Sequence, residues 1–370
     1  MEIIVLIFFY IISPFLLLTT LVTISNLLSA PRLERASSDD DRLVSICVPA
    51  RNEEHKIPHL MESILNQDYK KFEVILLDDG SQDKTLDAAL RYANKNKRIK
   101  VINGKPLPPG WTGKNWACHQ LSKIAEGEII IFVDADCRLS PYAVSTSLCY
   151  LKKYSLSLLS VFPGQIIDSF GEKLVVPLMN WILLSLLPLR MVYISSRESL
   201  AAANGQFMVF TKKAYDSIGG HLEIADKIVD DMELARRIKK NKFKMMTALD
   251  SRVISCKMYN SYDEARLGFS KNFYPGFNTR SLVFIIIILF LFVSYTLPFL
   301  LVIYYPIFTI HIAVILLQRL FVSLLSKQNL IVNLLLHPVQ MLIMANIGIQ
   351  SVYKSKKGKL IWKGRSLSKI

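Results

Sequence analysis

The sequence predicts an α/β domain with a mostly parallel, doubly wound sheet, together with membrane-spanning helices on both sides of it in the chain. Three observations support this prediction. Short apolar runs alternate with helical stretches between residues 42 and 278, which is the pattern of βαβ units. The runs are continuous rather than alternating, as in strands covered on both faces. Long apolar blocks lie near both ends of the chain, and such blocks are typical of membrane helices.

The α/β domain is expected to alternate strands and helices. Strands are predicted at residues 43–48, 72–77, 99–102 and 128–133, and helices between them at 55–67, 83–94 and 116–125. In a doubly wound sheet, ligands bind beyond the carboxyl ends of the strands. The residues that follow each strand are therefore the first candidates for a functional site.

Composition limits the choice of partners. The chain has 370 residues, 51% of them apolar, and a formal net charge of +15, which suits one large domain with additional segments. Its five cysteines form no C-x-x-C pair, which indicates buried thiols in a reducing compartment. The basic residues flank apolar segments without an aromatic-interleaved stripe, so no nucleic-acid partner is expected.

The N-terminal apolar segment, residues 3–24, is predicted to be an uncleaved membrane anchor within residues 1–28. It lacks a basic n-region and is long enough to span a bilayer, unlike a secretory signal. Arg32 and Arg35 follow it, and this positive flank places the next domain in the cytoplasm. We therefore expect a multi-pass protein of the plasma membrane with a cytoplasmic α/β domain at residues 42–278.

The C-terminal apolar block, residues 281–352, divides into segments at about 282–303, 307–325 and 330–350, followed by a basic tail at 353–370. The tail is expected to be cytoplasmic. Three full spans would place it outside, so the third segment, which contains several polar residues, is expected to be re-entrant or interfacial.

A further apolar stretch at about residues 170–195 is expected to form interfacial helices. Asn180 and Arg190 interrupt this stretch, and Pro177 and Pro188 are expected to break it.

Acidic residues follow the predicted strands. Asp134 and Asp136 come directly after an apolar run, as do Asp78 and Asp79. Residues i and i+2 of an extended chain point to the same side, so Asp134 and Asp136 are costly neighbours unless a cation or polar ligand lies between them.

Four sequence segments resemble the motifs of family 2 glycosyltransferases with the GT-A fold, a nucleotide-diphospho-sugar transferase domain. They are residues 48–53 (VPARNE), 78–81 (DDGS), 133–136 (VDAD) and 229–237 (VDDMELARR). Within the family, residues 113–118 (GKNWAC) and the overall layout look most like glycosyltransferases of carotenoid (diaponeurosporenoate) and hopanoid biosynthesis. His337-Pro338 and residues 362–365 (WKGR) resemble the ends of membrane-bound, lipid-modifying members.

The resemblance implies a role for each motif. Asp136, with Asp134 near it or near the ribose, would hold Mn²⁺ or Mg²⁺, whose preferred ligands are oxygens. The nucleotide-sugar would be bound by Pro49, Arg51, Glu53, Asp78, Asp79, Lys114 and Asp134. The alternative for residues 78–81 is a turn that caps the next helix.

The resemblance also implies a catalytic base and an acceptor loop. Asp231 would be the base, with Asp230 before it, although acids at a helix N-terminus also complement its dipole. Asn204, Gly205 and Gln206 resemble the acceptor-side loop, for which a simple strand-entry turn is the alternative. A single displacement would invert the anomeric centre. Residues 264–273 lack the Q-x-x-R-W motif of processive members, which favours addition of one sugar.

The favoured function is transfer of a sugar, with glucose as the family-level expectation, from a UDP-sugar to a membrane lipid such as a carotenoid acid or hopanoid. Two alternatives remain at this point. One is transfer to polyprenyl phosphate or diacylglycerol, and the other is a non-catalytic basic protein that binds membranes. The sequence does not distinguish the sugar, the acceptor, the path of the third C-terminal segment or the oligomeric state.

Overall fold

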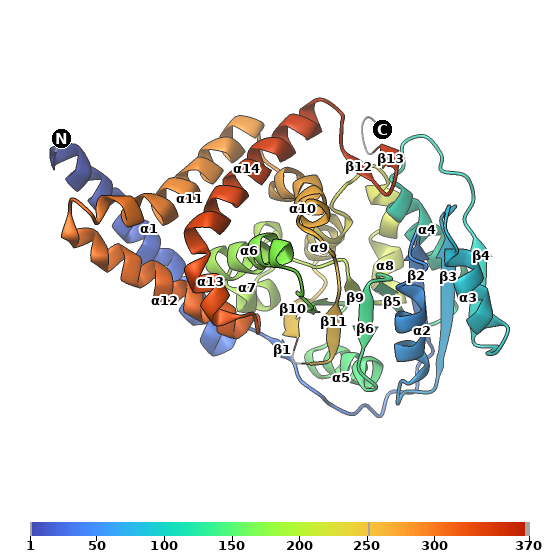
Figure 1. Ribbon diagram of the computed structural model, residues 1–370. Helices are drawn as coiled ribbons and strands as arrows, with labels where there is room; N and C mark the ends of the chain where they lie inside the picture. Colours follow the sequence, from blue (N-terminus) through green and yellow to red (C-terminus); the bar gives the residue numbers. More distant parts are fainter. Residues whose placement is uncertain (1, 251, 367–370) are drawn as a thin grey trace. The chain divides into compact units, whose positions relative to one another are not determined.

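A computed structural model describes residues 2–250 and 252–366 (Figure 1). The chain forms two compact units, and each is built from separate stretches of sequence. The helical unit contains residues up to 30, 167–190 and 259–360, and the sheet unit contains residues 31–166, 191–258 and those from 361 onward. The chain therefore passes repeatedly between the two units.

The sheet unit is built around an eight-stranded sheet with the order β1-β10-β7-β9-β5-β2-β3-β4. Every pair in it is parallel except those of β9, which runs antiparallel to both β5 and β7. Its strands are β1 (Arg32–Leu33), β2 (Val44–Ala50), β3 (Phe72–Asp78), β4 (Ile99–Asn103), β5 (Ile129–Val133), β7 (Leu158–Phe162), β9 (Phe207–Thr211) and β10 (Met245–Asp250). The mostly parallel α/β sheet expected from the sequence is confirmed.

Helices connect these strands, and a second, three-stranded sheet lies in the same unit. The helices are α2 (Ile57–Leu65), α3 (Thr85–Ala93), α4 (Gly113–Ile124), α5 (Ala143–Tyr154), α8 (Lys212–Ser217) and α9 (Asp230–Lys240), with 3₁₀ turns η1 (Glu198–Leu200) and η2 (Gly220–Ile224). The small sheet has the order β6-β11-β8, from β6 (Cys137–Leu139), β11 (Ile254–Cys256) and β8 (Gly164–Gln165). A short hairpin pairs β12 (Ile361–Trp362) with β13 (Arg365–Ser366).

The core of the sheet unit explains why its strands are apolar on both faces. Strands β3 and β5 are buried at every residue, and β2 at all but Pro49. Burial of each large aliphatic side chain contributes about 1.5–3 kcal/mol to folding. The acidic residues begin where this burial ends, so the core fixes the strands and leaves their carboxyl ends for chemistry.

The helical unit holds the long apolar segments. Its helices are α1 (Glu2–Ser29), α6 (Phe170–Leu186), α10 (Tyr262–Phe277), α11 (Ser281–Leu301), α12 (Thr309–Leu325), α13 (Leu330–Leu335) and α14 (His337–Lys356), with a 3₁₀ turn η3 (Pro306–Phe308). Short α7 (Leu189–Ile194) follows α6. Three segments are long and apolar enough to cross a membrane, Ile3–Ser29, Ser281–Leu301 and Pro306–Leu325. These three segments overlap the apolar segments predicted at residues 3–24, 282–303 and 307–325.

The fourth predicted apolar segment, at about 330–350, is divided into two helices. Helix α13 ends at Leu335, and α14 begins at His337 with Pro338 in its first turn, where the missing proline N–H costs no hydrogen bond. Neither helix is among the candidate spans in the described residues. Whether this segment is re-entrant or interfacial stays a prediction.

One expectation for the stretch at 170–195 is wrong. Pro177 was expected to break it, but α6 runs through Pro177 and ends before Pro188. A proline inside a helix leaves the carbonyl four residues earlier without its usual partner. Here that carbonyl belongs to Lys173, and the Gln340 amide donates a hydrogen bond to it at 2.7 Å. A side chain from α14 therefore replaces the hydrogen bond that the proline removes.

Gln340 also organises the polar interior of the helical unit. Its Oε1 accepts a hydrogen bond from the Arg319 guanidinium, and its Nε2 lies 3.2 Å from Oδ1 of Asn333. Arg319, on α12, is fully buried. This arginine therefore faces the protein interior, and the polar residues of α12, α13 and α14 form one network.

Candidate active site

The candidate site lies where three parallel strands of the sheet unit end. Strand β2 ends at Ala50 and is followed by Arg51 and Glu53, β3 ends at Asp78, and β5 is followed by Asp134. Because β3 and β5 both pair with β2 in parallel, their carboxyl ends lie at one edge. The structure therefore places the predicted donor residues of these three segments at the same edge of the sheet.

The antiparallel strand β9 brings the acceptor-side loop to that edge. Phe207, its first residue, pairs with Val133, the last residue of β5. The Asp134 backbone N–H donates to the Gln206 carbonyl at 3.0 Å, and the Gln206 N–H donates to Oδ1 of Asn204 at 2.8 Å. Residues 204–206 are thus a strand-entry turn, as the alternative interpretation had it, and this turn also lies directly against Asp134.

Lys114 lies between two acids and a backbone carbonyl from three segments of the chain. Its Nζ lies 2.9 Å from Oδ1 of Asp134, 3.7 Å from Oδ2 of Asp230 and 3.4 Å from the Gly205 carbonyl. Helix α4, on which it lies, begins at Gly113 and is capped by the Thr112 side chain. Burial lowers the pKa of Lys114, but Asp134 and then Asp230 outweigh burial and hold it well above its usual value. Lys114 is therefore a permanent cation at the centre of the cluster.

Asp231 is held by backbone donors instead of a cation. Its Oδ2 accepts from the Gly205 N–H at 2.8 Å and its Oδ1 from the Met232 N–H at 2.7 Å. Burial, and then the charge of Asp230, raise the pKa of Asp231 to about 6. At neutral pH the group is a carboxylate that accepts a proton more readily than an ordinary aspartate.

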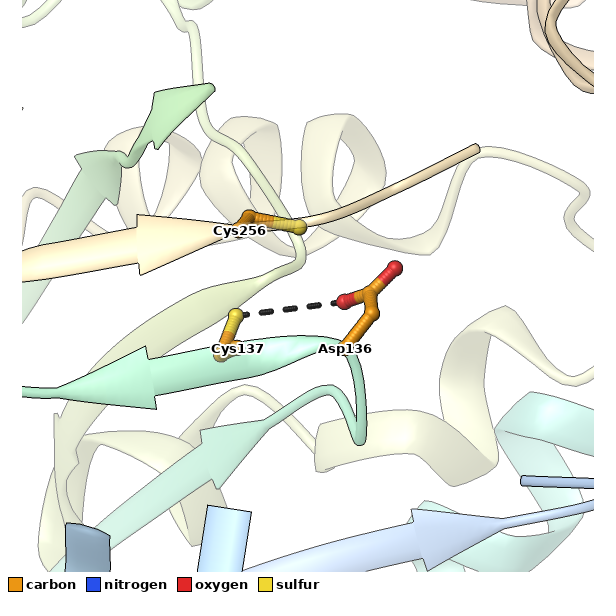
Figure 2. A group of neighbouring side chains, drawn as sticks. All are labelled: Asp136, Cys137 and Cys256. Carbon is orange, nitrogen blue, oxygen red and sulfur yellow. Dashed lines mark hydrogen bonds between the residues drawn. The ribbon is translucent and has the colours of Figure 1, made fainter. Parts of the chain in front are cut away.

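Asp136 lies beside two cysteines (Figure 2). The ligand atoms of Asp136, Cys137 and Cys256 all lie within 4.8 Å of one another, because Cys137 and Cys256 are paired across β6 and β11. The Cys137 thiol is 3.9 Å from Oδ1 of Asp136, which is a weak contact. Burial holds the pKa of the Cys256 thiol well above its usual value, so Cys256 is neutral near pH 7.

The surroundings of Asp136 fit a divalent cation. Burial, and then the charge of Asp134, raise its pKa to about 6. Among the described residues it forms no ion pair within 4 Å, although Lys56 is near enough to affect its pKa. A bound cation would stabilise a carboxylate whose negative charge has no ion-pair partner, and carboxylate oxygens suit Mn²⁺ or Mg²⁺. The geometry is thus consistent with the metal role expected for Asp136.

The nucleoside end of the predicted site is built from β2 and β3. Oδ2 of Asp78 accepts from the Ser81 N–H at 3.1 Å and so closes the turn after β3, but this turn does not cap the next helix, since α3 begins at Thr85 with Lys84 as its N-cap. Its Oδ1 is buried and has no hydrogen-bond partner among the described residues. The Arg51 guanidinium donates to the Gly80 carbonyl at 2.8 Å and to that of Asp79, so Arg51 holds the turn after β3 in place.

Two basic residues of the C-terminal hairpin form ion pairs with acids at the nucleoside end of the predicted site. Arg365 forms an ion pair with Asp79, and Lys363 forms one with Glu53. The sequence analysis associated residues 362–365 with the family but gave them no role in the site. His221, on η2, also lies near an acid of the site, with its Nε2 3.9 Å from Oδ2 of Asp230. Burial lowers the pKa of His221.

Comparison with known proteins identifies the domain. Residues 45–219 match the family model "Glycosyl transferase family 2". The 4,4'-diaponeurosporenoate glycosyltransferase of Staphylococcus aureus (strain USA300) is 28% identical over 345 residues, which cover 88% of each chain. The protein of that name from Staphylococcus haemolyticus is 25% identical over 230 residues, 62% of this chain and 60% of that relative.

A solved structure supports the fold. The mannosyltransferase PcManGT from Pyrobaculum calidifontis, solved in complex with GDP-Man and Mn2+, is similar over 93% of this chain and 96% of that chain, with a TM-score of 0.56 and 16% identity. Asp230 and Asp231 lie beyond the residues that the family model matches, so their roles rest on the geometry above. Residues 45–219 match glycosyltransferase family 2, the fold is of the GT-A type, and the chain is a glycosyltransferase that resembles carotenoid-modifying enzymes.

Proposed function

We propose that the protein is an inverting glycosyltransferase that moves one hexose, with glucose as the expected sugar, from a UDP-sugar to a terpenoid acid in the membrane. The observation that carries the proposal is Asp231, a carboxylate whose pKa is raised to about 6 and which is joined through Gly205 and Lys114 to Asp134. The relatives named for diaponeurosporenoate support a carotenoid acid as acceptor. A hopanoid is the neighbouring terpenoid choice.

The donor is assigned to the strand ends. Asp78 and Asp79 would contact the nucleoside, with Pro49, Arg51 and Glu53 beside them, and Lys114 would face the diphosphate. Asp136, with Asp134, would hold Mn²⁺ or Mg²⁺, which when bound neutralises charge on the departing diphosphate. Lys114 adds a fixed positive charge on the same side. These residues therefore bind the donor and favour departure of its leaving group.

The acceptor oxygen would attack the anomeric carbon while Asp231 takes the acceptor proton and the bond to the diphosphate breaks. A carboxylic acid that arrives from a bilayer is neutral, since its charge is disfavoured there. The pKa of such an acid is much closer to the value of about 6 of Asp231 than the pKa of an alcohol is, so transfer of its proton to Asp231 costs little. The same transfer from an alcohol is strongly unfavourable. The Asp231 carboxylate is therefore better matched to an acid acceptor.

The membrane arrangement follows from the candidate spans. We propose that Ile3–Ser29, Ser281–Leu301 and Pro306–Leu325 cross the plasma membrane and that the sheet unit lies in the cytoplasm, where UDP-sugars are made. The basic residues after α1 and in the last turn of α14 agree with this orientation. The stretch at 170–195 would lie in the interface, where a lipid acceptor is accessible.

The test uses membranes from cells that express the protein and contain carotenoid acids, incubated with Mn²⁺ and each labelled UDP-sugar in turn. Label should enter the organic extract, and mild alkali should release it, because a sugar joined to a carboxyl group is an ester. Alkali-stable labelled lipid would contradict an acid acceptor, and acid-labile, phosphate-containing product would favour polyprenyl phosphate. A glycosyl diacylglycerol would also lose its label to the aqueous phase, because alkali cleaves its acyl esters, but as glycosylglycerol instead of free sugar, and that product would favour the other lipid alternative. Absence of transfer with every sugar, despite UDP binding, would leave a non-catalytic membrane protein.

A further inference from the structure

The C-terminal hairpin, residues 361–366, lies on the nucleoside end of the candidate site and beside α4 (Figure 1). Its two strands have two residues each, and Lys363 and Gly364 form the turn with φ of 46° and 78°. Positive φ at both central residues is the geometry of a tight hairpin turn. Lys363 adopts it although a lysine does so at some cost, which places Lys363 and Arg365 at one end of the hairpin.

Both basic side chains are engaged with the site. The Arg365 Nη2 donates to the Asp79 carbonyl at 3.0 Å and its Nη1 to the Asp79 carboxylate. The Lys363 Nζ donates to the Arg51 carbonyl at 2.7 Å and to the Glu53 carboxylate. In return, Nε of Arg51 donates to the Lys363 carbonyl at 3.2 Å. The hairpin thus contacts the residues that follow β2 and β3 and were assigned to the donor.

The Arg365 guanidinium also lies at the start of α4. A Cβ on Gly113 would be 2.9 Å from its Nη1 and 3.0 Å from Oδ2 of Asp79, so a side chain at this position would shift the Arg365–Asp79 pair. The N-terminus of a twelve-residue helix carries partial positive charge and favours anions. A cation there is unfavourable unless an anion shares the position. Asp79 supplies one negative charge, and a diphosphate would supply more.

The two ion pairs alone contribute too little stability to explain why the hairpin lies on Asp79 and Glu53. Arg365 and Lys363 are about a quarter exposed, at 27% and 21%, and partly exposed ion pairs contribute about 0–1 kcal/mol. A two-stranded hairpin of this size is barely stable by itself. Burial also keeps the pKa of Asp79 above its usual value despite the lowering by Arg365. A bound phosphate group would add charged hydrogen bonds to the two hairpin cations and would so strengthen the contact of the hairpin with the residues that follow β2 and β3.

We propose that the C-terminal hairpin is part of the donor site, and that Arg365 and Lys363 bind the nucleoside diphosphate of the donor. The proposal rests on the assignment of this site to a nucleotide-sugar. Arg365 donates only to Asp79 among the described residues, so the rest of its five-donor fork is available to phosphate oxygens, which such a fork binds bidentately. Lys363 adds a point charge beside it.

The experiment measures UDP binding by calorimetry, and the donor KM, with the full chain in detergent. Arg365→Ala should weaken UDP binding and raise the donor KM about tenfold, in line with loss of one or two charged hydrogen bonds, while kcat changes less. Arg365→Lys should restore part of the affinity, and Lys363→Ala should have a smaller effect. Lys359→Ala is the matched control, because Lys359 is an exposed cation of the same tail outside the hairpin.

A second comparison separates donor binding from support of Asp79. If Arg365 acts only by neutralising Asp79, Arg365→Ala will have no further effect on UDP binding in an Asp79→Asn chain. If it contacts the nucleotide, the same loss will appear in both backgrounds. Equal UDP affinity in Arg365→Ala and the parent would overturn the proposal, as would tighter binding, which would make the hairpin an inhibitor of the site.

The outcome is separable from that of the proposed function. Transfer of sugar by the parent with an unchanged donor KM in Arg365→Ala would refute the role of the hairpin and leave the glycosyltransferase function in place. UDP binding that depends on Arg365, in a protein that transfers no sugar to any lipid acid, would support the hairpin and refute the proposed acceptor.

Discussion

Two pairs of acids at the same edge of the sheet are treated in opposite ways. The outer acids, Glu53 and Asp79, each form an ion pair with a cation of the C-terminal hairpin. The inner acids, Asp136 and Asp231, form no ion pair among the described residues, and the pKa of each is raised to about 6. Of these two inner acids, only Asp231 accepts strong hydrogen bonds in the described residues, from two backbone N–H groups.

The difference shows where folding and chemistry make different demands. A buried carboxylate without a cation costs folding free energy, so a sequence selected for stability alone would pair or replace it. The outer acids satisfy that demand, and the inner acids do not. Uncompensated acids are expected where a metal ion or an acceptor proton supplies the missing positive charge. The comparison therefore assigns chemistry to the inner acids and recognition to the outer acids.

The largest expected effect is that of Asp231→Asn. Loss of a general base reduces kcat by about 10²–10⁴. The folded-state pKa of about 6 exceeds the ordinary 3.8, so the ionised group is disfavoured in the folded protein and its removal should raise the melting temperature at pH 7. Initial rates and thermal unfolding in detergent test both expectations. Asp226→Asn, an exposed acid, is the control, and a fall in both rate and stability would mean that Asp231 is structural.

Asp136→Asn should abolish tight Mn²⁺ binding, because the amide lacks the negative charge with which Asp136 attracts the cation. The readout is the Mn²⁺ affinity by electron paramagnetic resonance, and transfer should fall about 100-fold with it. Asp87→Asn, an exposed acid on α3, should leave the affinity unchanged. Retained Mn²⁺ affinity in Asp136→Asn would place the metal elsewhere.

Lys114→Met should turn a compensated acid cluster into an uncompensated one. Asp134 and Asp230 would lose their shared cation, and such a loss costs about 3 kcal/mol in stability when the site is buried. Thermal unfolding is the measurement, and adding Asp230→Asn to the same chain should recover part of the loss. Lys123→Met, at the exposed end of the same helix, is the matched control. Equal melting temperatures for the two lysine variants would contradict the central role of Lys114.

The smallest effect concerns pH. Transfer should decline as the pH falls through about 6, because protonated Asp231 accepts no proton. Asp230→Asn removes the neighbouring charge that raises this pKa, so its rate profile should have an acid limb at lower pH. The profile of kcat/KM with saturating metal tests the shift. An unchanged limb in Asp230→Asn would assign it to another group.

The fold was largely predictable from the sequence because β2, β3 and β5 are predominantly apolar runs and helices α2, α3 and α4 separate the strands from β2 to β5. The position of strand β9 in the sheet was harder to predict from the sequence. It is antiparallel between β5 and β7, and no local pattern states which distant strand a short apolar run will join. The passage of α6 through Pro177 depended on Gln340, 167 positions from the carbonyl that it satisfies.

The acids of the site were predictable for a geometric reason, since the carboxyl ends of parallel strands meet. The cations that form ion pairs with these acids were harder to predict from the sequence. Lys114 is close to the acids in sequence and was found through its motif, whereas Arg365 and Asp79 are 286 positions apart. The basic tail was expected only to be cytoplasmic, because a run of cations attracts lipid headgroups and protein carboxylates alike and so does not indicate a particular partner.

The position of the C-terminal hairpin in the chain has a consequence for how the protein is made. Residues 361–366 come after α11, α12 and α14, yet they complete the ion pairs of Glu53 and Asp79 in the sheet unit. A ribosome that has finished strands β1 to β11 has therefore made every acid of the site but neither hairpin cation. These ion pairs form only after the apolar helices have been synthesised, so the donor end is assembled last, when the membrane segments are already available for insertion.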